Sequence, residues 1–167
     1  AKATFFMVGQ SVPRYKSAVK KMSKIGCELG NHTYDHPDLT RLSAGQISSQ
    51  ISRTNSAIKD ACGKTATVMR PPYGSYNSYV LSSLGMPAIL WSVDTRDWAT
   101  LNPYSTISHV KNNVRDGSII LFHDLYSPTV NAAIELIPWL QKQGYQLVTI
   151  SEIAKYRTGG LSAGKTY

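Results

Sequence analysis

The chain has 167 residues, of which 18 are Lys or Arg and 10 are Asp or Glu, so its formal net charge is +8. This length suits one domain, residues 1–167, and we find no apolar run that could cross a bilayer and no secretory leader, so we expect a soluble or already processed chain. The positive charge favours an anionic partner such as a cell-wall polymer, a nucleic acid or a membrane face. The basic residues are scattered and form no nucleic-acid-binding tract, so we expect a solvated basic surface and no nucleic-acid partner.

Apolar and β-branched runs predict strands at residues 3–8, 27–31, 68–70, 88–93, 118–122 and 146–150. Helical spacing predicts helices at residues 13–25, 43–62, 76–84, 102–114 and 130–143, and a short closing helix that Ser151 caps. The glycine-rich residues 159–164 are expected to form a surface strap or the end of the domain. Alternating strands and helices imply an α/β fold of parallel strands, a sheet or a barrel with helices outside.

The sequence predicts further details for two of these helices. Ser43 and Gln46 have the spacing of a capping box, with Leu42 and Ile47 placed as its hydrophobic staple. In residues 130–143 the apolar side chains expected to face inward are Ile134, Ile137 and Leu140, and Pro138 predicts a kink or a late start.

Two cysteines, Cys27 and Cys62, lie far apart in the sequence and have no Cys-x-x-Cys spacing. They are either two buried thiols or one disulfide. The sequence leaves both possibilities open.

Polar clusters follow four of the predicted strands, where the chemistry of parallel α/β folds collects. They are His32 with His36, residues 70–73, residues 94–98, and His123 with Asp124. Each cluster also has a structural interpretation: loop histidines, an arginine that braces a turn, aspartates that cap a helix, or a carboxylate that holds a ring. Four clusters at the same end of consecutive strands favour a functional site.

Together these residue types can form a hydrolytic site. Two histidines at His-x-x-x-His spacing can hold a divalent ion, which acidifies its bound water. A histidine paired with an aspartate can act as a general acid, an arginine can orient a carboxylate, and a backbone N–H can stabilise an oxyanion.

The motifs HTYDH, RPPYG, DTRDW and LFHD, with ATFF near the start, occur here in the order of one family. From residue 1 to about Tyr156 the chain resembles the catalytic domain of the polysaccharide deacetylases, carbohydrate esterase family 4. The resemblance implies a distorted (β/α) barrel and removal of acetyl groups from a polysaccharide. It also implies a divalent metal, most commonly zinc, with cobalt or another ion as an alternative.

The same resemblance assigns roles residue by residue. His32 and His36 would bind the metal, Arg70 would tether the catalytic base, and the Tyr73 backbone N–H would face the oxyanion. His123 would be the general acid, oriented by Asp97, while Trp98 and Leu121 would line the groove around the acetyl methyl group. Asp94 matches the motif and is expected to have a structural role.

One departure from the family pattern is large. The Thr-Phe-Asp-Asp-Gly segment, which carries the catalytic base and the third metal ligand, does not occur in this sequence. A metal with two protein ligands has fewer than catalytic zinc usually has, and a buried Arg70 without its carboxylate costs roughly 3 kcal/mol or more. We therefore expect an incomplete barrel whose first strand and helix come from a separate N-terminal fragment, were cleaved off, or belong to the same chain outside residues 1–167. Substitution by Asp35, Asp38 or Asp124 is possible by spacing but not favoured.

Two classes of function remain. The first is an enzyme that removes N-acetyl groups from a GlcNAc-containing polymer, of the peptidoglycan or chitin type, or an acetylxylan esterase of the same family. WSVDTRDW and RPPYGSYN resemble the peptidoglycan and chitin branch more, and this substrate class implies an extracellular or cell-wall location. The second is a non-catalytic carbohydrate-binding domain that keeps the fold without the base.

Overall fold

The computed structural model describes residues 1–167 and divides them into two compact units. Residues 2–90 and 149–167 form the first, called the large unit, and Ala1 with residues 91–148 forms the second, called the small unit. None of the helices combines the length and the apolar composition that a membrane span requires.

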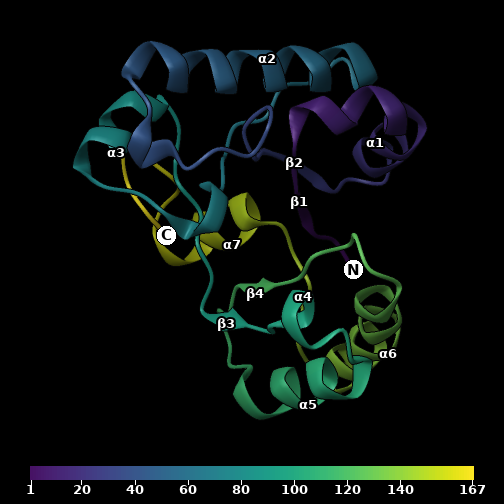
Figure 1. Cartoon of the computed structure of the whole chain (residues 1–167). Helices are drawn as coiled ribbons and strands as arrows, with labels where there is room; N and C mark the ends of the chain where they lie inside the picture. Colours follow the sequence, from purple (N-terminus) through teal and green to yellow (C-terminus); the bar gives the residue numbers. More distant parts are fainter. The chain divides into compact units, whose positions relative to one another are not determined.

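Short parallel strands form the centre of the large unit (Figure 1). β1 (Thr4–Met7) pairs with β2 (Glu28–Asn31). Single parallel bridges continue the ladder from Asn31 to Met69, from Met69 to Ala88 and from Ala88 to Thr166. The strands predicted at residues 3–8 and 27–31 are therefore confirmed, whereas the predicted strand at 68–70 is reduced to a bridge.

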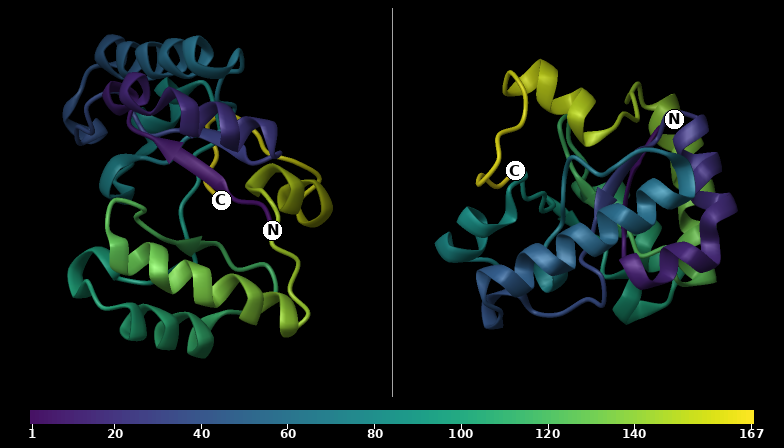
Figure 2. Two further views of the ribbon diagram at one scale, coloured as in Figure 1. Left: turned by 90° about the vertical axis from the view of Figure 1, so that its right-hand side faces the viewer. Right: turned by 90° about the horizontal axis from the view of Figure 1, so that it is seen from above.

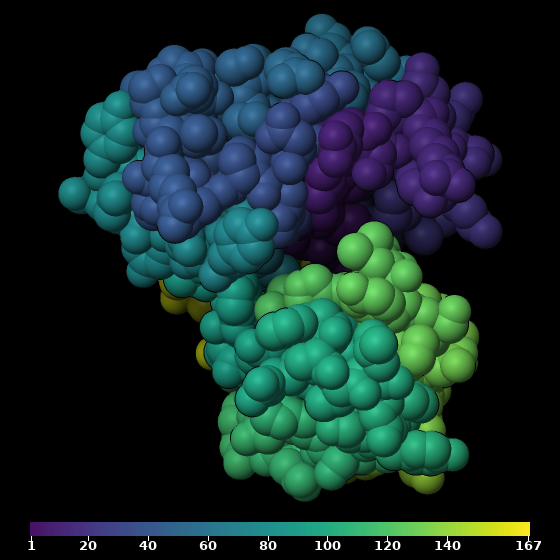
Figure 3. Space-filling view, viewed as in Figure 1, coloured from purple at the N-terminus to yellow at the C-terminus, as the bar shows by residue number.

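The helices of the large unit are η1 (Gly9–Tyr15), α1 (Lys16–Lys24), η2 (Leu39–Arg41), α2 (Ala44–Cys62), η3 (Pro72–Gly74), α3 (Ser78–Leu84) and α7 (Ile150–Arg157). The predicted capping box of α2 is present, because Ser43 and Gln46 exchange side-chain to backbone hydrogen bonds. Ile47 and Ile58 of α2 are fully buried in two core clusters. In the space-filling view, the purple surface of η1 and α1 adjoins the blue surface of α2 (Figure 3).

The small unit contains β3 (Val93–Asp94) paired in parallel with β4 (Ile120–Leu121). Its helices are α4 (Asp97–Thr100), α5 (Pro103–Asn113) and α6 (Ser127–Lys142). α5 and α6 lie side by side (Figure 2) and bury an apolar cluster that comprises Ile107, Val110, Val114, Ala132, Leu136 and Leu140.

The predicted inward face of α6 is partly wrong. Leu140 is buried, but Ile134 is 66% exposed and Ile137 is 40% exposed. The helix begins at Ser127 rather than at residue 130, and its buried face is Thr129, Ala132, Leu136 and Leu140. Pro138 lies inside the helix without ending it.

The predicted strand at residues 146–150 is also wrong, as is the cap at Ser151. Residues 145–149 have no regular structure, and α7 begins at Ile150. Thr149 caps α7 in a second capping box: its hydroxyl accepts from the Glu152 backbone N–H, and the Glu152 carboxylate accepts from the Thr149 N–H. This reciprocal pair fixes the start of α7 at Thr149 and Ile150, at the end of the predicted strand.

Both cysteines are free thiols and form no disulfide, but they are half-buried rather than buried as the first of the two possibilities had it. The C-terminal residues form more than a surface strap, since the backbone of Tyr167 exchanges hydrogen bonds with Ala88 and Leu90. The α/β class with parallel strand pairing is as predicted.

Candidate active-site clusters

His32 and His36 follow β2 directly and bring two ring nitrogens together. Their Nε2 atoms are 3.1 Å apart, and the ring planes meet at 71°. His32 Nδ1 lies 2.6 Å from the carbonyl oxygen of Arg70. A carbonyl oxygen only accepts, so Nδ1 carries the hydrogen and His32 Nε2 presents a lone pair.

The backbone between the two histidines is held in an unusual conformation. Thr33 and His36 both have positive φ, 64° and 63°, which non-glycine residues seldom adopt. The buried Asn31 side chain accepts a hydrogen bond from the Thr33 N–H and donates to Ile51 and Asn55 of α2. The Thr33 hydroxyl accepts from the His36 N–H. Local hydrogen bonds thus fix the turn that brings the two rings together.

This geometry fits a bound divalent ion. With metal–nitrogen distances of about 2.0–2.1 Å, two nitrogens 3.1 Å apart subtend about 100° at the ion, close to a tetrahedral angle. The hydrogen bond from His32 Nδ1 to a carbonyl is the second-shell contact that metal-binding histidines usually make. No third His, Cys, Asp or Glu of residues 1–167 completes a ligand group.

The three aspartates weighed as substitute ligands give no ligand group either. Asp38 caps η2, where its carboxylate accepts from Thr40. Asp35 accepts a hydrogen bond from the Gln50 side chain.

Arg70 is 8% exposed, on the segment that also supplies the carbonyl to His32. Its Nε donates to the Ile89 carbonyl at 3.2 Å and its Nη2 to the Leu90 carbonyl at 2.8 Å. The guanidinium carbon lies 4.3 Å from the centre of the Phe6 ring. Burial lowers the pKa of Arg70 to about 10, so the side chain remains charged at neutral pH.

Tyr73 lies next to His36 in the same unit. Its ring contacts the His36 ring edge-on at 4.7 Å, and its hydroxyl donates to the His36 carbonyl at 3.4 Å. The backbone of Tyr73 has φ 60°, inside η3. A left-handed residue between Pro72 and Gly74 turns the peptide sharply, the kind of strain that often accompanies functional sites.

A second cluster lies in the small unit, around Asp97. The Asp97 carboxylate is 1% exposed and accepts from the His123 ring at 2.9 Å, the His123 backbone N–H at 2.6 Å and the Thr129 hydroxyl at 2.8 Å. Burial raises the pKa of Asp97, but the hydrogen bonds from His123 and Thr129 outweigh it and hold this pKa at about 2. An ionised Asp97 keeps the hydrogen on His123 Nδ1 and leaves Nε2 available for proton transfer.

The remaining predicted residues of the small unit differ in exposure. Leu121 is buried in β4, and Trp98 is 51% exposed in α4. The Asp94 carboxylate accepts from the Arg96 N–H, in keeping with a structural role. The groove around Trp98 and Leu121 remains a prediction.

Each unit therefore assembles part of the predicted set: His32, His36, Arg70 and Tyr73 in the large unit, and Asp97, Trp98, Leu121 and His123 in the small unit. Three further residues, Asn31, Gln50 and Thr129, were not predicted although they hydrogen-bond directly to these clusters or to the loop between the two histidines. The position of Asn31 directly before the histidine motif was the only signal among the three.

Sequence comparison places the chain among the polysaccharide deacetylases. The family model described as polysaccharide deacetylase matches residues 1–89. The chain is 41% identical over 155 residues to the peptidoglycan-N-acetylmuramic acid deacetylase PdaC of Bacillus subtilis, covering 93% of this chain and 33% of PdaC. It is 39% identical over 166 residues to the peptidoglycan-N-acetylglucosamine deacetylase PgdA of Listeria monocytogenes, covering 99% of this chain and 35% of PgdA.

A third relative is matched over more of its length. The chitooligosaccharide deacetylase of Bradyrhizobium sp. is 34% identical over 169 residues, covering 90% of this chain and 77% of that protein. By contrast, the chain spans about a third of the length of PdaC and PgdA.

Solved structures give the same assignment. PdaC from Bacillus subtilis superposes with a TM-score of 0.91 at 40% identity, over 95% of this chain and 79% of that one. A family 4 acetyl xylan esterase from Clostridium thermocellum, in complex with cobalt, gives 0.92 at 30% identity, over 99% and 84%. A CE4 family pseudoenzyme from Bacillus anthracis gives 0.84 at 31% identity, over 100% and 57%.

Proposed function

Because the chain belongs to the polysaccharide deacetylase family, we propose that it forms part of a metal-dependent hydrolase that removes N-acetyl groups from a GlcNAc-containing polysaccharide. The observation that carries the proposal is the pair of Nε2 atoms, 3.1 Å apart, of His32 and His36. The hydrogen bond from His32 Nδ1 to the Arg70 carbonyl gives that ring the tautomer a cation requires.

His32 and His36 would hold the divalent ion, most commonly zinc in this family, with cobalt as an alternative. When bound, the ion supplies Lewis acidity at the acetyl carbonyl and to the attacking water. The cobalt complex of the related acetyl xylan esterase supports a divalent ion of this kind.

His123 is the proposed general acid. In hydrolysis, the general base takes a proton from the water, whose oxygen bonds to the acetyl carbon. The carbon–nitrogen bond then breaks, and the leaving nitrogen takes its proton from His123 Nε2. Asp97 orients the ring through its hydrogen bond with Nδ1. The products are acetate and a free amine.

The other predicted residues would position the reactants. The Tyr73 backbone N–H donates to the oxyanion that develops on the acetyl group. Trp98 and Leu121 border the acetyl methyl group, and Arg70 orients the carboxylate of the general base.

We place the general base on an Asp-Asp segment outside residues 1–167, together with the third metal ligand. The resemblance to the family supports this placement, as does the absence of a third ligand beside His32 and His36 within residues 1–167. The segment would come from the N-terminal side of the same protein, either continuous with this chain or as a separate fragment.

Peptidoglycan or a chitin-type glycan is the proposed substrate, and the outside of the cell or the cell wall is the proposed location. Two relatives are named for peptidoglycan and one for chitooligosaccharide. PdaC is named for N-acetylmuramic acid, so the test includes both sugars of peptidoglycan. Because one solved neighbour is an acetyl xylan esterase, acetylated xylan is included as a comparison substrate.

A non-catalytic carbohydrate-binding protein is the second candidate, because one solved neighbour is a CE4 family pseudoenzyme. The Asp97–His123 pair favours the enzyme, since sugar binding alone does not require a positioned proton donor. Glycan binding without acetate release would support the second candidate.

The test is acetate release by the purified full-length protein from peptidoglycan, chitooligosaccharide and acetylated xylan. Intact mass under denaturing conditions and elemental analysis of metal accompany the assay. We expect acetate release, near-stoichiometric metal, and loss of activity by at least about a hundredfold in His123→Ala, in line with general acid catalysis. The exposed His109→Ala is the matched control. Full activity in His123→Ala, or a folded metal-free protein without activity, would contradict the proposal.

A further inference from the structure

Gln50 of α2 is hydrogen-bonded to the loop that joins the two histidines. Its Oε1 accepts from the backbone N–H of Tyr34 at 2.7 Å and of Asp35 at 3.2 Å. Its Nε2 donates to Asp35 Oδ1 at 2.7 Å. The two N–H groups require the oxygen and the carboxylate requires the nitrogen, so these partners fix the orientation of the amide.

The residues held in this way lie between the two positive-φ positions of the loop, Thr33 and His36. A left-handed conformation at a non-glycine residue persists only where surrounding contacts enforce it. Asn31 fixes the start of the loop through the Thr33 N–H, and Gln50 fixes its middle. Displacement of the backbone at Tyr34 and Asp35 therefore changes where the His36 ring points relative to His32.

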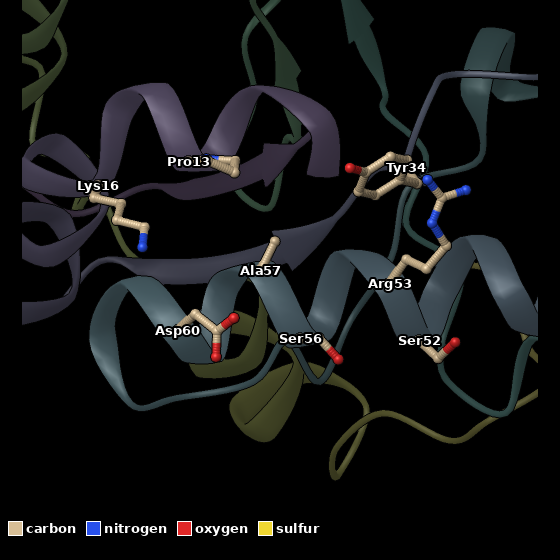
Figure 4. Close-up of a pocket in the computed structure, with 8 residues that line it drawn as sticks. All are labelled: Pro13, Lys16, Tyr34, Ser52, Arg53, Ser56, Ala57 and Asp60. Carbon is tan, nitrogen blue, oxygen red and sulfur yellow. The ribbon is translucent and has the colours of Figure 1, made fainter.

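A second contact from α2 differs in kind. The Arg53 guanidinium carbon lies 3.6 Å from the centre of the Tyr34 ring, at one side of an open pocket between η1, α1 and α2 (Figure 4). This contact holds the Tyr34 side chain. The peptide groups of the loop are held instead by Gln50, which accepts from two of their N–H groups, and by the N–H groups of Gly9 and Gln10, which donate to the Thr33 and Tyr34 carbonyls at 2.9 Å each. Variants of Gln50 and Arg53, which both lie on α2, therefore separate the effect of holding the loop backbone from the effect of holding the Tyr34 side chain.

We propose that Gln50 is a positioning residue for the metal site: its amide holds the His32–His36 loop so that the two Nε2 atoms converge on one cation. This inference rests on the proposed function, because it takes the two histidines to be metal ligands. It adds a residue outside the four motifs, in the middle of a helix with no sequence feature of its own.

The donor and acceptor pattern allows a rescue experiment. In Gln50→Glu, a carboxylate replaces the amide N–H donor that faced the Asp35 carboxylate. The two like charges repel each other and push the loop away from α2. In the double variant Gln50→Glu with Asp35→Asn, the new side-chain amide at position 35 donates to the new carboxylate at position 50. That carboxylate also remains an acceptor for the two backbone N–H groups of the loop. Asp35→Asn alone retains an acceptor for Gln50 Nε2.

The experiment measures the Co²⁺ dissociation constant of the full-length protein by competition with a chelator, and the visible absorption spectrum of bound Co²⁺. We expect Gln50→Glu and Gln50→Leu to weaken Co²⁺ binding about tenfold, the lower end of the range for lost second-shell contacts, because Gln50 acts through the loop and not directly on a histidine. The double variant should return to within about threefold of the unaltered protein and recover its spectrum. Two control variants should leave the Co²⁺ dissociation constant within about twofold of that of the unaltered protein. They are Gln141→Glu, which makes the same chemical change at an exposed position of α6, and Arg53→Gln.

The opposite outcomes are equally specific. If Gln50→Leu binds Co²⁺ with unchanged affinity and spectrum while His32→Ala does not bind it, the inference about Gln50 is wrong and the metal site stands. If the double variant is no better than Gln50→Glu, the reversed hydrogen bonds do not restore the site and the inference is also wrong. If the unaltered protein binds no divalent ion, this inference and the proposed function fail together.

Discussion

Asp97 accepts three hydrogen bonds in a buried position, and its ionised state therefore contributes to stability. The pKa of about 2 in the folded protein lies below the value of about 3.9 in an unfolded chain. This contribution is fully present above about pH 4 and is lost as the pH falls towards 2. The linked free energy is about 2 kcal/mol.

The first prediction concerns this pH dependence. We expect Asp97→Asn to destabilise the protein at pH 6, and the difference in unfolding free energy from the unaltered protein to shrink by about 2 kcal/mol between pH 5 and pH 2. Urea unfolding of both proteins at a series of pH values measures this difference. Other carboxylates such as Glu152 titrate in both proteins and cancel in the comparison. A difference that stays constant with pH would show that the ionisation of Asp97 does not stabilise the fold.

Gly9 lies against α2 and the histidine loop so closely that a methyl group does not fit. A Cβ there would lie 2.5 Å from Thr54 Oγ1, 2.7 Å from Tyr34 Cδ2 and 2.9 Å from Thr54 Cα. The backbone of α2 cannot yield easily, so we expect Gly9→Ala to lower the unfolding free energy by about 1–3 kcal/mol. Thermal or urea unfolding measures the change.

Gly45 is the control for this substitution. It lies in the first turn of α2, with no atom within 4 Å of an added Cβ. We expect Gly45→Ala to leave stability unchanged or to raise it by up to about 1 kcal/mol. Equal effects at the two glycines would contradict the packing argument.

At the scale of the elements, α1 has an unfavourable charge pattern. Lys16, Lys20 and Lys24 are exposed and follow one another at i, i+4 spacing on the same face. We expect Lys20→Glu to replace two repulsions by two attractions and to raise the unfolding free energy by about 1 kcal/mol at low salt. Urea unfolding at low and high salt measures the gain, which should diminish with screening.

Lys20→Gln separates the two parts of this effect. It removes the repulsion without adding attraction, so its gain should be about half that of Lys20→Glu. No gain in either variant would mean that solvent already screens the charges of α1.

Helix starts are predictable where a capping motif stands apart from strand-like sequence, and not where the two overlap. Ser43 and Gln46 cap α2 as predicted, whereas the same type of motif at Thr149 and Glu152 overlaps an apolar run that predicts a strand. The misassigned face of α6 has a related cause. Periodicity gives the spacing of a buried face, but the buried stripe of Thr129, Ala132, Leu136 and Leu140 includes a threonine and an alanine that hydropathy does not mark.

The residues of the candidate site also divide into those that a sequence motif reveals and those that it does not. The side chains within motifs were predicted, because His32, Arg70, Asp97 and His123 belong to short polar segments after strands. Thr129 and Gln50 were not, because each meets its partner only through folding, 32 residues from Asp97 and 16 residues from Tyr34. A single polar residue inside a helix has no local pattern that reveals such a contact.

For the whole molecule, a bound ion should act on stability as well as on activity. A ligand that binds only the folded state stabilises it by about 2.7 kcal/mol at a free concentration of 100 times its dissociation constant. We therefore expect Zn²⁺ or Co²⁺ to raise the melting temperature of the full-length protein and a chelator to lower it again. Calorimetry with and without the ion measures the change.

His36→Ala should abolish this shift in melting temperature. It removes one of the two converging nitrogens and leaves the Asp97 cluster intact. An undiminished shift in this variant would locate the stabilising ion elsewhere in the protein.

The large unit is assembled from two segments of chain that are far apart in sequence, residues 2–90 and 149–167. Thr4 Oγ1 accepts from the Ile150 N–H, Glu28 accepts from Ser151, and Thr166 pairs with Ala88. These contacts close very long loops, which slows folding because the entropy of closure is lost before the contacts form. During synthesis, the contacts of β1 and β2 with α7 have to wait until the ribosome has made the whole small unit. Until then residues 2–90 expose the partners of α7 and of the C-terminal residues, which leaves this part of the nascent chain open to proteolysis and aggregation.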